Sequence, residues 1–443
     1  MPAASPDDLT RHAQDVLDRN RRGDWTCPSN DLYPHQWLWD SCFTAIGLAR
    51  TDPLRAAGEL RALLRGQWAN GMLPHMIFAE GTHDVGSRRL WQSTRNPAAP
   101  RDIETSCITQ PPIAAIATER VANALSDADR RAFLSDLYTR VVDYHRWLYR
   151  ERDLRGTGLV TLIHPWECGL DSTPPWMRAL ARMPQPPWMR LVSTLRLAGV
   201  VRFFRRDTKY IPANERASDD DGLRMLVLAR RIRRFDCEFR RLPTETTVQI
   251  EDVAFNSFLV VANQALTRMA AVLGETIDPE LARRFTATES ALEELWDEET
   301  GQYYSRDAVS GELLAVPTVA TFLPLWTGVP GEERQARLLA LVQEPSPYWP
   351  RYPVPSVATD ADAFDEDRYW DGPTWINTNW AIIEGLEHIN ATGAANELRR
   401  RTIDLVDRSG FAEYFSPLDG EGFGAEDFSW SAALTLDLVQ ARV

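Results

Sequence analysis

His164-Pro-Trp-Glu-Cys-Gly-Leu-Asp171 is the stretch around which the chain is organised. It lies between two helical segments, and its proline and glycine interrupt any regular element. A rigid loop of this kind presents a carboxyl group beside a flat aromatic ring. The ring stacks on the apolar face of a sugar, and the carboxyl group handles protons at the glycosidic oxygen. The stretch therefore predicts a carbohydrate site in which Asp171 acts as the general acid.

Helical patterns dominate the rest of the chain, between loops rich in aromatic residues, proline and glycine. Ser5-Pro6 and Asp52-Pro53 each place a capping side chain before a proline in a first helical turn. Ser126 caps a longer run whose apolar residues keep helical spacing. We expect about a dozen helices, which begin at Ser5 and Asp278 or cover 37–50, 54–65, 109–124, 126–150, 220–240, 251–272, 331–343, 375–391, 394–408 and 428–442.

Helix pairs joined by long loops on one side predict an all-α toroid, in which the loops at one end form the site. An α-solenoid is the alternative, but no self-similarity of fixed period supports it. We expect a single domain over residues 1–443, with a loop or lid insertion at about 172–215. Within this insertion, the stretch from Arg190 to Phe204 is apolar and basic. It is either a lid over the pocket or an amphipathic packing helix.

Composition excludes several classes of function. A net charge of −14 over 443 residues argues against a nucleic-acid or anionic-membrane partner. No run of about 18 apolar residues is present, so we expect no segment to span a bilayer. Lys209 is the only lysine, and it lies in no Gly-rich loop. Pyridoxal chemistry and P-loop phosphate transfer each need a placed lysine, and no GxGxxG follows a strand, so we expect none of these cofactors.

The N-terminus and the cysteines predict a cytoplasmic protein. The first residues, Met1-Pro-Ala-Ala-Ser-Pro-Asp-Asp8, lack the basic and apolar regions of a signal peptide. We expect the cysteines to be reduced thiols rather than a disulfide framework or a zinc site, because they are an odd, scattered set without CxxC. They are Cys27, Cys42, Cys107, Cys168 and Cys237. No HxH or HExxH indicates another metal site, and the sequence leaves homo-oligomer formation open.

Four loops combine aromatic and acidic side chains, and they cover residues 33–41, 164–171, 368–375 and 411–417. In the first loop, Trp37 and Trp39 can stack on a sugar ring, and Asp40 can accept hydrogen bonds from its hydroxyls. The last loop carries Glu413 on a short extended piece. Tryptophan and tyrosine near helix starts are often core anchors. Four such loops in one chain nevertheless favour a sugar site over four unrelated packing clusters.

Six motifs follow one another over about residues 28–440. They are Pro34-His-Gln-Trp-Leu-Trp-Asp-Ser41, Leu73-Pro-His75, Ile108-Thr-Gln-Pro-Pro112, the stretch from His164 to Asp171, Tyr369-Trp-Asp-Gly-Pro-Thr-Trp-Ile-Asn377 and Glu413-Tyr-Phe-Ser-Pro417. Together they resemble glycoside hydrolase family 63, and in particular its bacterial mannosylglycerate and glucosylglycerate hydrolases. The resemblance implies an (α/α)6 barrel that needs no cofactor and hydrolyses a small α-glycoside with inversion. The expected carbohydrate substrate is glucosylglycerate or mannosylglycerate.

Position by position, the resemblance places the general acid at Asp171 and the general base at Glu413. Inversion needs one carboxylic acid to protonate the leaving oxygen and one carboxylate to activate water on the opposite face. Burial among aromatic rings would raise the pKa of the acid, as this role requires. Asp40 is a competing candidate for the base, and Glu167 is expected to orient other groups. The expected substrate-binding residues are Tyr33, Trp37, Trp39, Asp40, Gln110, Trp166, Gly169 and Arg216, together with Tyr369, Trp370, Gly372 and Trp375 of a loop that closes over the substrate.

Two departures from the family pattern concern the aglycone. Residues 79–104 lack the expected tyrosine-containing Pro-Gly-Pro loop and contain Arg88, Arg89 and Arg95 instead. Asp371 stands where an arginine is usual, which replaces a cation by an anion in that loop. Arg216, which matches the arginine that holds the substrate carboxylate, still favours an anionic aglycone because an arginine fork fits a carboxylate.

Three other functions fit parts of the pattern. The first is an α-glucosidase that acts on neutral di- or oligosaccharides. The second is a sugar-binding relative without catalysis, which is disfavoured because both Asp171 and Glu413 are present. The third is a sugar epimerase or isomerase, which would use paired histidines as acid and base. Of the histidines, His35, His75 and His164 lie in loop motifs, where we expect them to be hydrogen-bonding scaffold residues.

Overall fold

The computed structural model of this chain describes residues 5–82, 84–184, 186, 189, 211–212, 215–216 and 218–440. Within these residues, six inner helices close a ring, because each contacts the next and the last contacts the first. They are α2 (Leu38–Leu48), α5 (Ala114–Ala124), α11 (Val253–Leu273), α13 (Pro324–Thr327), α15 (Ile376–His388) and α17 (Ser429–Gln440). The chain therefore folds as an (α/α)6 barrel, which confirms the predicted fold class.

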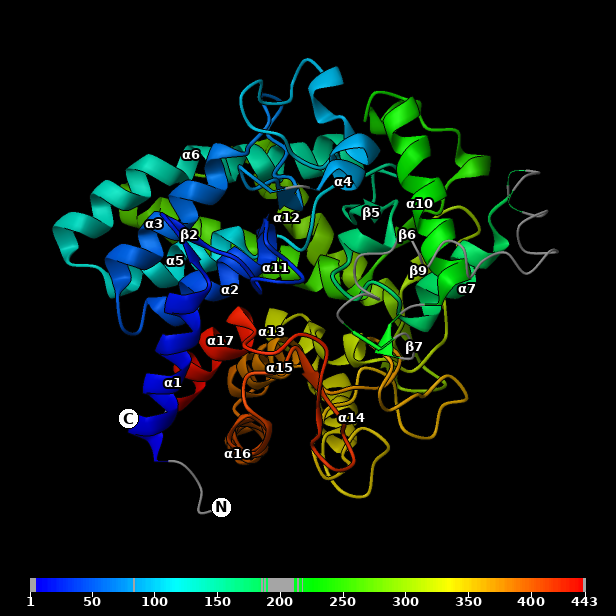
Figure 1. Cartoon of the computed structure of the whole chain (residues 1–443). Helices are drawn as coiled ribbons and strands as arrows, with labels where there is room; N and C mark the ends of the chain where they lie inside the picture. The colour runs from blue at the N-terminus through cyan, green and yellow to red at the C-terminus, as the bar shows by residue number, and fades with distance from the viewer. Residues whose placement is uncertain are drawn as a thin grey trace.

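A second layer of helices surrounds the ring. It includes α1 (Pro6–Arg19), α3 (Pro53–Arg65), α6 (Asp127–Arg152), α12 (Pro279–Leu292) and α16 (Thr392–Ser409), which pack on α17, α2, α5, α11 and α15 respectively. The remaining described helices are α4 (Val85–Trp91), α7 (Pro174–Arg182), α10 (Asp219–Arg234) and α14 (Glu332–Leu341). Figure 1 shows α1, in blue, beside α17, in red, so the two ends of the chain meet where the ring closes.

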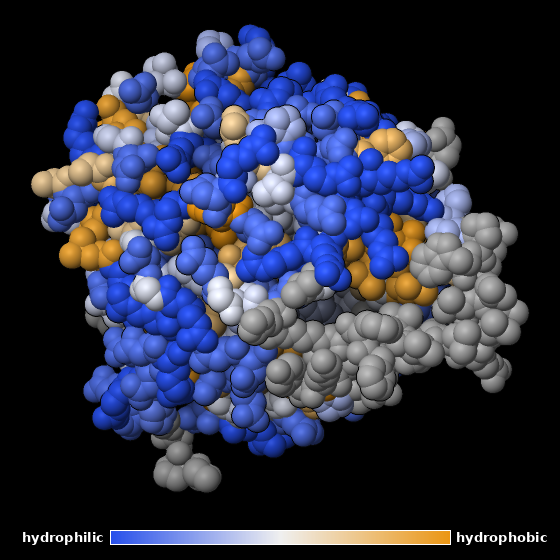
Figure 2. Space-filling view, turned by 45° about the horizontal axis from the view of Figure 1, so that its top comes forward, coloured by the Kyte–Doolittle hydropathy of each residue, from blue (hydrophilic) through white to orange (hydrophobic). Residues whose placement is uncertain are grey.

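The residue patterns explain which helices lie inside. Every residue of α2 is buried, so this helix is covered on all sides. The outer helix α1 instead buries one face, with residues at helical spacing such as Leu9, Ala13 and Val16. Figure 2 shows the result on one face of the molecule, which is largely hydrophilic and carries apolar side chains only in small, separate patches. None of the described helices is long and apolar enough to cross a membrane.

Strands in the described residues are short pairs between the helices. They are β1 (Arg21–Arg22) with β2 (Trp25–Thr26), β3 (Gln36–Trp37) with β4 (Met76–Ile77), β7 (Trp296–Asp297) with β8 (Gln302–Tyr303), β10 (Tyr414–Phe415) with β11 (Gly422–Phe423), and the three-stranded β5 (Thr161–Leu162), β6 (Ile250–Glu251) and β9 (Arg306–Asp307). All pairs are antiparallel. They brace the loops that enter the inner helices.

The loops before α2, α15 and α17 meet at one end of the ring. Trp37 and Trp375 are the N-cap residues of α2 and α15. The Trp39 ring lies 6.5 Å from the Trp370 ring, and the Trp375 ring lies 5.7 Å from the Trp430 ring. Side chains in these loops therefore face a common space at the N-terminal ends of the helices, where the helix dipoles favour negative charge.

The helices expected from the sequence are present, although the segment 109–124 becomes helical only at Ala114. The structure corrects the expectation that residues 172–184 are irregular, since α7 occupies much of this part of the insertion. Pro174 and Pro175 begin the helix rather than prevent it, because a proline is compatible with the first helical turn. The short helices α4 and α13 were not predicted. The stretch from Arg190 to Phe204 lies outside the described residues.

Candidate active site

Three carboxyl groups at this end of the ring lie close enough together for their charges to influence one another's pKa. Asp40 is in the first turn of α2, Asp171 follows the short 3₁₀ helix η2 (Pro165–Glu167), and Glu413 directly precedes β10. Burial raises the pKa of Asp40 and of Asp171 well above the usual range, and the Glu413 carboxylate raises both further. The structure thus brings together the predicted acid, the predicted base and the competing candidate for the base.

Asp171 has the properties of a proton donor. Burial and the neighbouring Glu413 raise its pKa, while the Arg216 guanidinium and the Tyr369 side chain lower it without cancelling the rise. The side chain keeps partial exposure, so it is not sealed in the core. A carboxyl group that keeps its proton to a higher pH than an exposed aspartate, and that remains accessible, can protonate a leaving oxygen.

The loop that carries Asp171 is fixed by Glu167, which binds four donors. Its carboxylate accepts from Nη1 and Nη2 of Arg152 at 2.9 and 2.6 Å and from the backbone N–H groups of Ile163 and Thr109 at 2.8 and 3.3 Å. Glu167 is therefore placed as the orienting residue that the sequence predicts. Gly169 has φ +78°, and a Cβ there would come within 2.5 Å of the Trp39 ring. Only glycine allows this loop to pack directly on Trp39.

Glu413 accepts hydrogen bonds from four donors as well. Its Oε1 accepts from the Tyr33 hydroxyl at 3.0 Å and from Arg216 Nη1 at 3.3 Å. Its Oε2 accepts from Arg216 Nη2 at 2.7 Å and from the Ala425 backbone N–H at 2.9 Å. A carboxylate, with about four acceptor directions, suits this set of donors, whereas a protonated carboxyl group would have to donate in one of them. Glu413 is thus held in the form that a general base needs.

The hairpin of β10 and β11 creates this position. Glu413 donates its backbone N–H to the Ala425 carbonyl, so the two residues pair beyond the ends of the strands. Gly424 has φ +74°, and a Cβ there would lie 2.5 Å from Glu413 Oε2. Gly424 and Ala425 were not predicted as site residues. The Asp419-Gly420 turn sequence that follows Glu413 is a hairpin signal that would have indicated them.

Arg216 lies at the centre of the site, paired with Glu413. Its guanidinium carbon lies 4.7 Å from the centre of the Tyr369 ring and 5.9 Å from those of Tyr33 and Tyr414. Burial disfavours its charge, but the Glu413 carboxylate holds the pKa of Arg216 well above its usual value. The family resemblance implies that Arg216 binds a substrate carboxylate, and in this structure the same guanidinium binds a carboxylate of the protein.

Tyr369 reaches the site from a tight loop. Its φ of +37° is unusual for an aromatic residue and points to a backbone held by its surroundings. Gly372 belongs to the same turn, where a Cβ would overlap the Asp365 carbonyl. The Trp370 and Trp375 rings stack on each other at 3.8 Å and are fully buried. Both tryptophan rings contact the Tyr369 ring edge-on. Their contact with substrate remains a prediction.

Four of the expected aromatic site residues are partly exposed: Tyr33, Trp37, Trp166 and Tyr369. The Trp37 ring lies edge-on to His75, and Trp166 stacks parallel to the same histidine. Gln110 accepts a hydrogen bond from the Trp39 backbone N–H at 3.3 Å, which ties its loop to the start of α2. These positions agree with a sugar platform, and binding by each residue remains a prediction.

The histidines near the site act as scaffold residues, as predicted. His164 Nδ1 accepts from the Trp166 backbone N–H, and Nε2 bonds the Met225 carbonyl. Burial lowers the pKa of His164 to about 4 and that of His75 well below its usual value. Both therefore stay neutral near pH 7. His75 bonds the Ser106 hydroxyl, and His35 bonds Asp84.

Comparison with known proteins also points to a carbohydrate-cleaving site. A family model described as "Mannosylglycerate hydrolase MGH1-like glycoside hydrolase domain" matches residues 33–431, a range that includes all of these side chains. The chain belongs to this family of glycoside hydrolases. The prediction of an O-glycosyl hydrolase of family 63 is thereby confirmed.

Relatives of this glycoside hydrolase match it over nearly its whole length. The mannosylglycerate hydrolase of Thermus thermophilus is 40% identical over 430 residues, which cover 96% of this chain and 99% of that protein. The glucosylglycerate hydrolase of Mycolicibacterium hassiacum is 32% identical over 98% of each chain. The crystal structure of the GH63 mannosylglycerate hydrolase from a second strain of Thermus thermophilus, in complex with Tris and D-glycerate, matches with a TM-score of 0.87 and 38% identity, over 97% of this chain and 99% of that one.

Two of the arginines that depart from the family pattern form ion pairs within the protein. Arg88 pairs with Glu104, and Arg95 pairs with Asp236. Asp371 was expected to place an anion in the loop of Tyr369, but burial raises its pKa to about 7. Near neutral pH this glycoside hydrolase therefore carries only part of a negative charge at Asp371.

The cysteine prediction is wrong for two residues. Cys107 and Cys237 form a disulfide with their Cα atoms 5.6 Å apart, whereas Cys27, Cys42 and Cys168 are free and buried. Since 130 residues separate the pair, no local spacing could indicate it. The bond ties the segment before Gln110 to the chain that follows α10 in this glycoside hydrolase.

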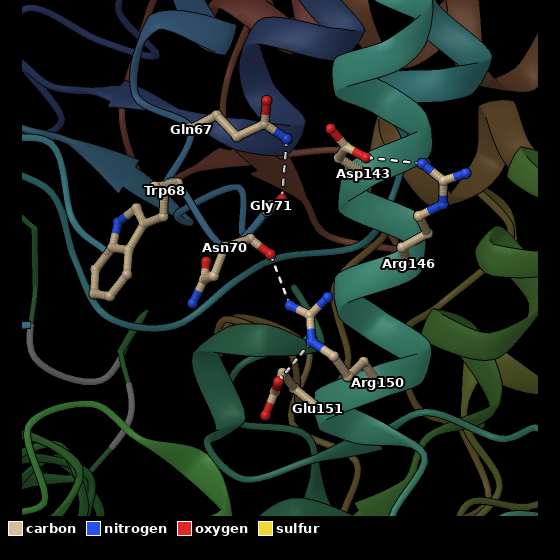
Figure 3. A pocket seen from close by; sticks show the side chains of 9 residues that line it. Gln67, Trp68, Asn70, Gly71, Asp143, Arg146, Arg150 and Glu151 are labelled. Atoms are coloured by element: carbon tan, nitrogen blue, oxygen red, sulfur yellow. Dashed lines mark hydrogen bonds and ion pairs between the residues drawn. The ribbon is translucent and has the colours of Figure 1, made fainter. Parts of the chain in front are cut away.

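A surface pocket beside α6 lies apart from the site. Figure 3 shows that its charged side chains are paired with their neighbours: Arg146 bonds Asp143, and Arg150 bonds both Glu151 and the Asn70 carbonyl. None of the predicted site residues lines this pocket. Among the residues that the structure describes, no cluster of His, Cys, Asp or Glu is arranged to hold a metal ion.

Proposed function

We propose that this glycoside hydrolase cleaves the α-glycosidic bond of glucosylglycerate or mannosylglycerate with inversion and releases the sugar and glycerate. The observation that carries the proposal is the contrast between two neighbouring carboxyl groups. Burial raises the pKa of Asp171, and Glu413 lies among four hydrogen-bond donors. Carboxyl groups whose environments differ in this way are typical of acid and base assignments in glycosidases.

The roles follow from these environments. Asp171 donates its proton to the glycosidic oxygen as the bond to the anomeric carbon breaks. Glu413 takes a proton from a water molecule that attacks the anomeric carbon from the opposite face. Asp40, buried at the N-terminus of α2, accepts hydrogen bonds from sugar hydroxyls. Tyr33, Trp37 and Trp166 supply the aromatic surface on which the sugar stacks.

Two observations support a glycerate aglycone. Relatives named mannosylglycerate and glucosylglycerate hydrolase match nearly the whole chain, and the solved relative contains D-glycerate. The site holds Arg216, whose planar fork can bind a carboxylate. A neutral α-glucoside is the second candidate, because in this structure the fork of Arg216 is already paired with Glu413.

A proton NMR time course tests the proposal. The purified protein is incubated with glucosylglycerate, mannosylglycerate, trehalose, kojibiose and a simple α-glucoside. We expect one of the two glycerates to be hydrolysed, with the β-anomer appearing first. Retention of configuration would contradict the water mechanism, and turnover of a neutral disaccharide alone would select the second candidate.

We propose a cytoplasmic location as well. The three buried free thiols suit a reducing compartment, whereas the disulfide between Cys107 and Cys237 speaks against it. Alkylation of intact cells before lysis, followed by mass spectrometry, separates the two cases. Alkylated Cys107 and Cys237 would support the cytoplasm, and a disulfide already formed in the living cell would contradict it.

A further inference from the structure

The proposed general base has no acceptor direction left for water in this structure. Tyr33, the two Nη atoms of Arg216 and the Ala425 backbone N–H supply four donors to the two oxygens of Glu413. A carboxylate has about four lone-pair directions. To take a proton from an attacking water, Glu413 must first lose one of these hydrogen bonds.

The bonds to Arg216 are the ones that a ligand can replace. The Ala425 N–H is fixed by the hairpin, because Glu413 and Ala425 also pair through their backbones. The Tyr33 hydroxyl donates only one bond, and it accepts another from Arg216 at 2.9 Å. Arg216 provides two of the four donors from a residue 197 positions away in the sequence. Movement of this one guanidinium would open an acceptor direction on each oxygen of Glu413.

Arg216 also has an unused donor. Its Nε atom is buried and has no hydrogen-bond partner, although the side chain is only 3% exposed. Nε of Arg152, in a purely structural ion pair, is also buried without a partner, so the free Nε of Arg216 shows only that this donor is available to a ligand. Nε and the adjacent Nη form a second edge of the guanidinium that can bind a carboxylate through two parallel bonds. One Nη atom belongs to both edges and already binds Glu413, so a small carboxylate bound at the second edge would draw the guanidinium away from Glu413.

We propose that Arg216 holds the base Glu413 in an inactive, fully hydrogen-bonded state, and that the carboxylate of the aglycone releases it by binding the guanidinium. This inference rests on the proposed function, because it takes the substrate to be a glycoside of a small hydroxy acid. It adds that the charge of the aglycone acts on the rate of the chemical step and not only on binding. A neutral aglycone of the same shape would leave the base blocked.

Glycosyl fluorides separate activation from binding. An α-glycosyl fluoride carries the sugar but leaves the aglycone position empty, so free D-glycerate can be added beside it. Fluoride leaves without a proton, and the rate then depends on water activated by Glu413. We expect D-glycerate to accelerate hydrolysis of the fluoride in a saturable manner, by about 5- to 150-fold, the usual range of coupling between two sites. Neutral glyceramide, of nearly the same shape, should have no such effect.

The variant Arg216→Lys sharpens the test. A lysine ammonium cannot form the two-pronged pair, so we expect faster hydrolysis of the fluoride without glycerate and a loss of the response to glycerate. Arg150→Lys, in the surface pocket, is the matched control and should respond like the wild type. If fluoride hydrolysis is unchanged or slowed by D-glycerate in the wild type, the inference is overturned.

A second readout uses complete substrates and needs no variant. The glycosylglycerate is compared with the corresponding glycosylglyceramide. Release of the base predicts a lower kcat for the amide, whereas a purely binding role of Arg216 predicts a higher KM at an unchanged kcat. An unchanged kcat would refute the inference and leave the proposed function standing. Failure of the proposed function looks different, because then neither glycerate is hydrolysed while a neutral glycoside is.

Discussion

Arg152–Glu167 and Arg216–Glu413 are two buried, forked ion pairs with almost the same hydrogen bonding. In the first pair the side chains are 2% and 0% exposed, and in the second they are 3% and 2% exposed. Both glutamates bind four donors, two of them from the arginine. Geometry and burial therefore do not distinguish a structural pair from a functional one.

The surroundings of the two pairs do distinguish them. Arg152 lies between the Trp147 and Phe239 rings, and 15 residues separate it from Glu167. Arg216 lies among three tyrosine rings, and the carboxyl groups of Asp40 and Asp171 share the electrostatic environment of Glu413. The first pair holds a loop in place, and the second lies beside the carboxyl groups that we propose carry out the reaction.

The largest expected effect is on the reaction itself. Glu413→Gln replaces the base by an amide that cannot take a proton, so kcat should fall by about 10²- to 10⁴-fold. Initial rates on the glycerate that proves to be the substrate measure this. The matched variant Glu167→Gln, assayed well below its unfolding temperature, should lower kcat far less, because Glu167 positions the loop of Asp171 and takes no proton from water. Near-full activity of Glu413→Gln would move the base to Asp40, which Asp40→Asn would then reveal.

The next largest effect is a loss of stability when the Arg152–Glu167 pair is broken. Arg152→Met leaves the buried carboxylate of Glu167 without its cation, which typically destabilises a fold by about 3–5 kcal/mol. Urea unfolding followed by circular dichroism measures the loss. Since Glu167 also binds two backbone N–H groups, replacing both partners by methionine should not restore stability. A double variant as stable as the wild type would show that those backbone contacts matter little.

A smaller effect is expected from the glycine beside the base. Gly424→Ala forces a Cβ toward Glu413 at a positive φ, a strain of about 1–3 kcal/mol, and should lower kcat. Gly311→Ala is the matched control, because its φ of +77° is similar but no atom lies within 4 Å of the added Cβ. Steady-state kinetics of both variants separate displacement of Glu413 from general backbone strain. Equal kinetics in the two variants would remove Gly424 from the site.

The last expected effect is a pH dependence of the reaction rate. Burial raises the pKa of Asp171, so its proton is kept to a higher pH than in an exposed aspartate and is lost as pH rises through the raised pKa. Above that value kcat on the glycerate substrate should fall about tenfold per pH unit, because only the protonated acid assists the leaving group. The α-glycosyl fluoride needs no proton and should lack this alkaline decline. A decline of equal steepness for both substrates would assign it to another group.

Local sequence patterns predicted the helices of this fold well, but they predicted the long-range contacts between side chains less well. Capping residues such as Ser5, Asp52 and Ser126 mark true helix starts, because they act within a few residues of the helix that they begin. Pro174 and Pro175 misled the prediction, since a double proline is compatible with either a loop or a first helical turn. Asp171 and Glu413 could be proposed from their motifs.

Their partners depend on long-range contacts that no local pattern contains. Arg216 meets Glu413 across 197 residues, and Cys107 meets Cys237 across 130. In the sequence Arg152 looks like any other helical arginine, and only the structure shows that it pairs with Glu167. The helices can thus be derived from periodicity and the (α/α)6 barrel from the family resemblance, whereas the pairing of charges inside the fold needs coordinates.

The disulfide between Cys107 and Cys237 makes the catalytic-acid region a covalently closed loop. Asp171, Glu167, Arg152 and Arg216 all lie between the two cysteines in the sequence. A protease that cuts once anywhere within this stretch would leave a single molecule on a non-reducing gel and two fragments on a reducing one. A clipped enzyme would still keep the acid and Arg216 attached to the chain that carries Glu413.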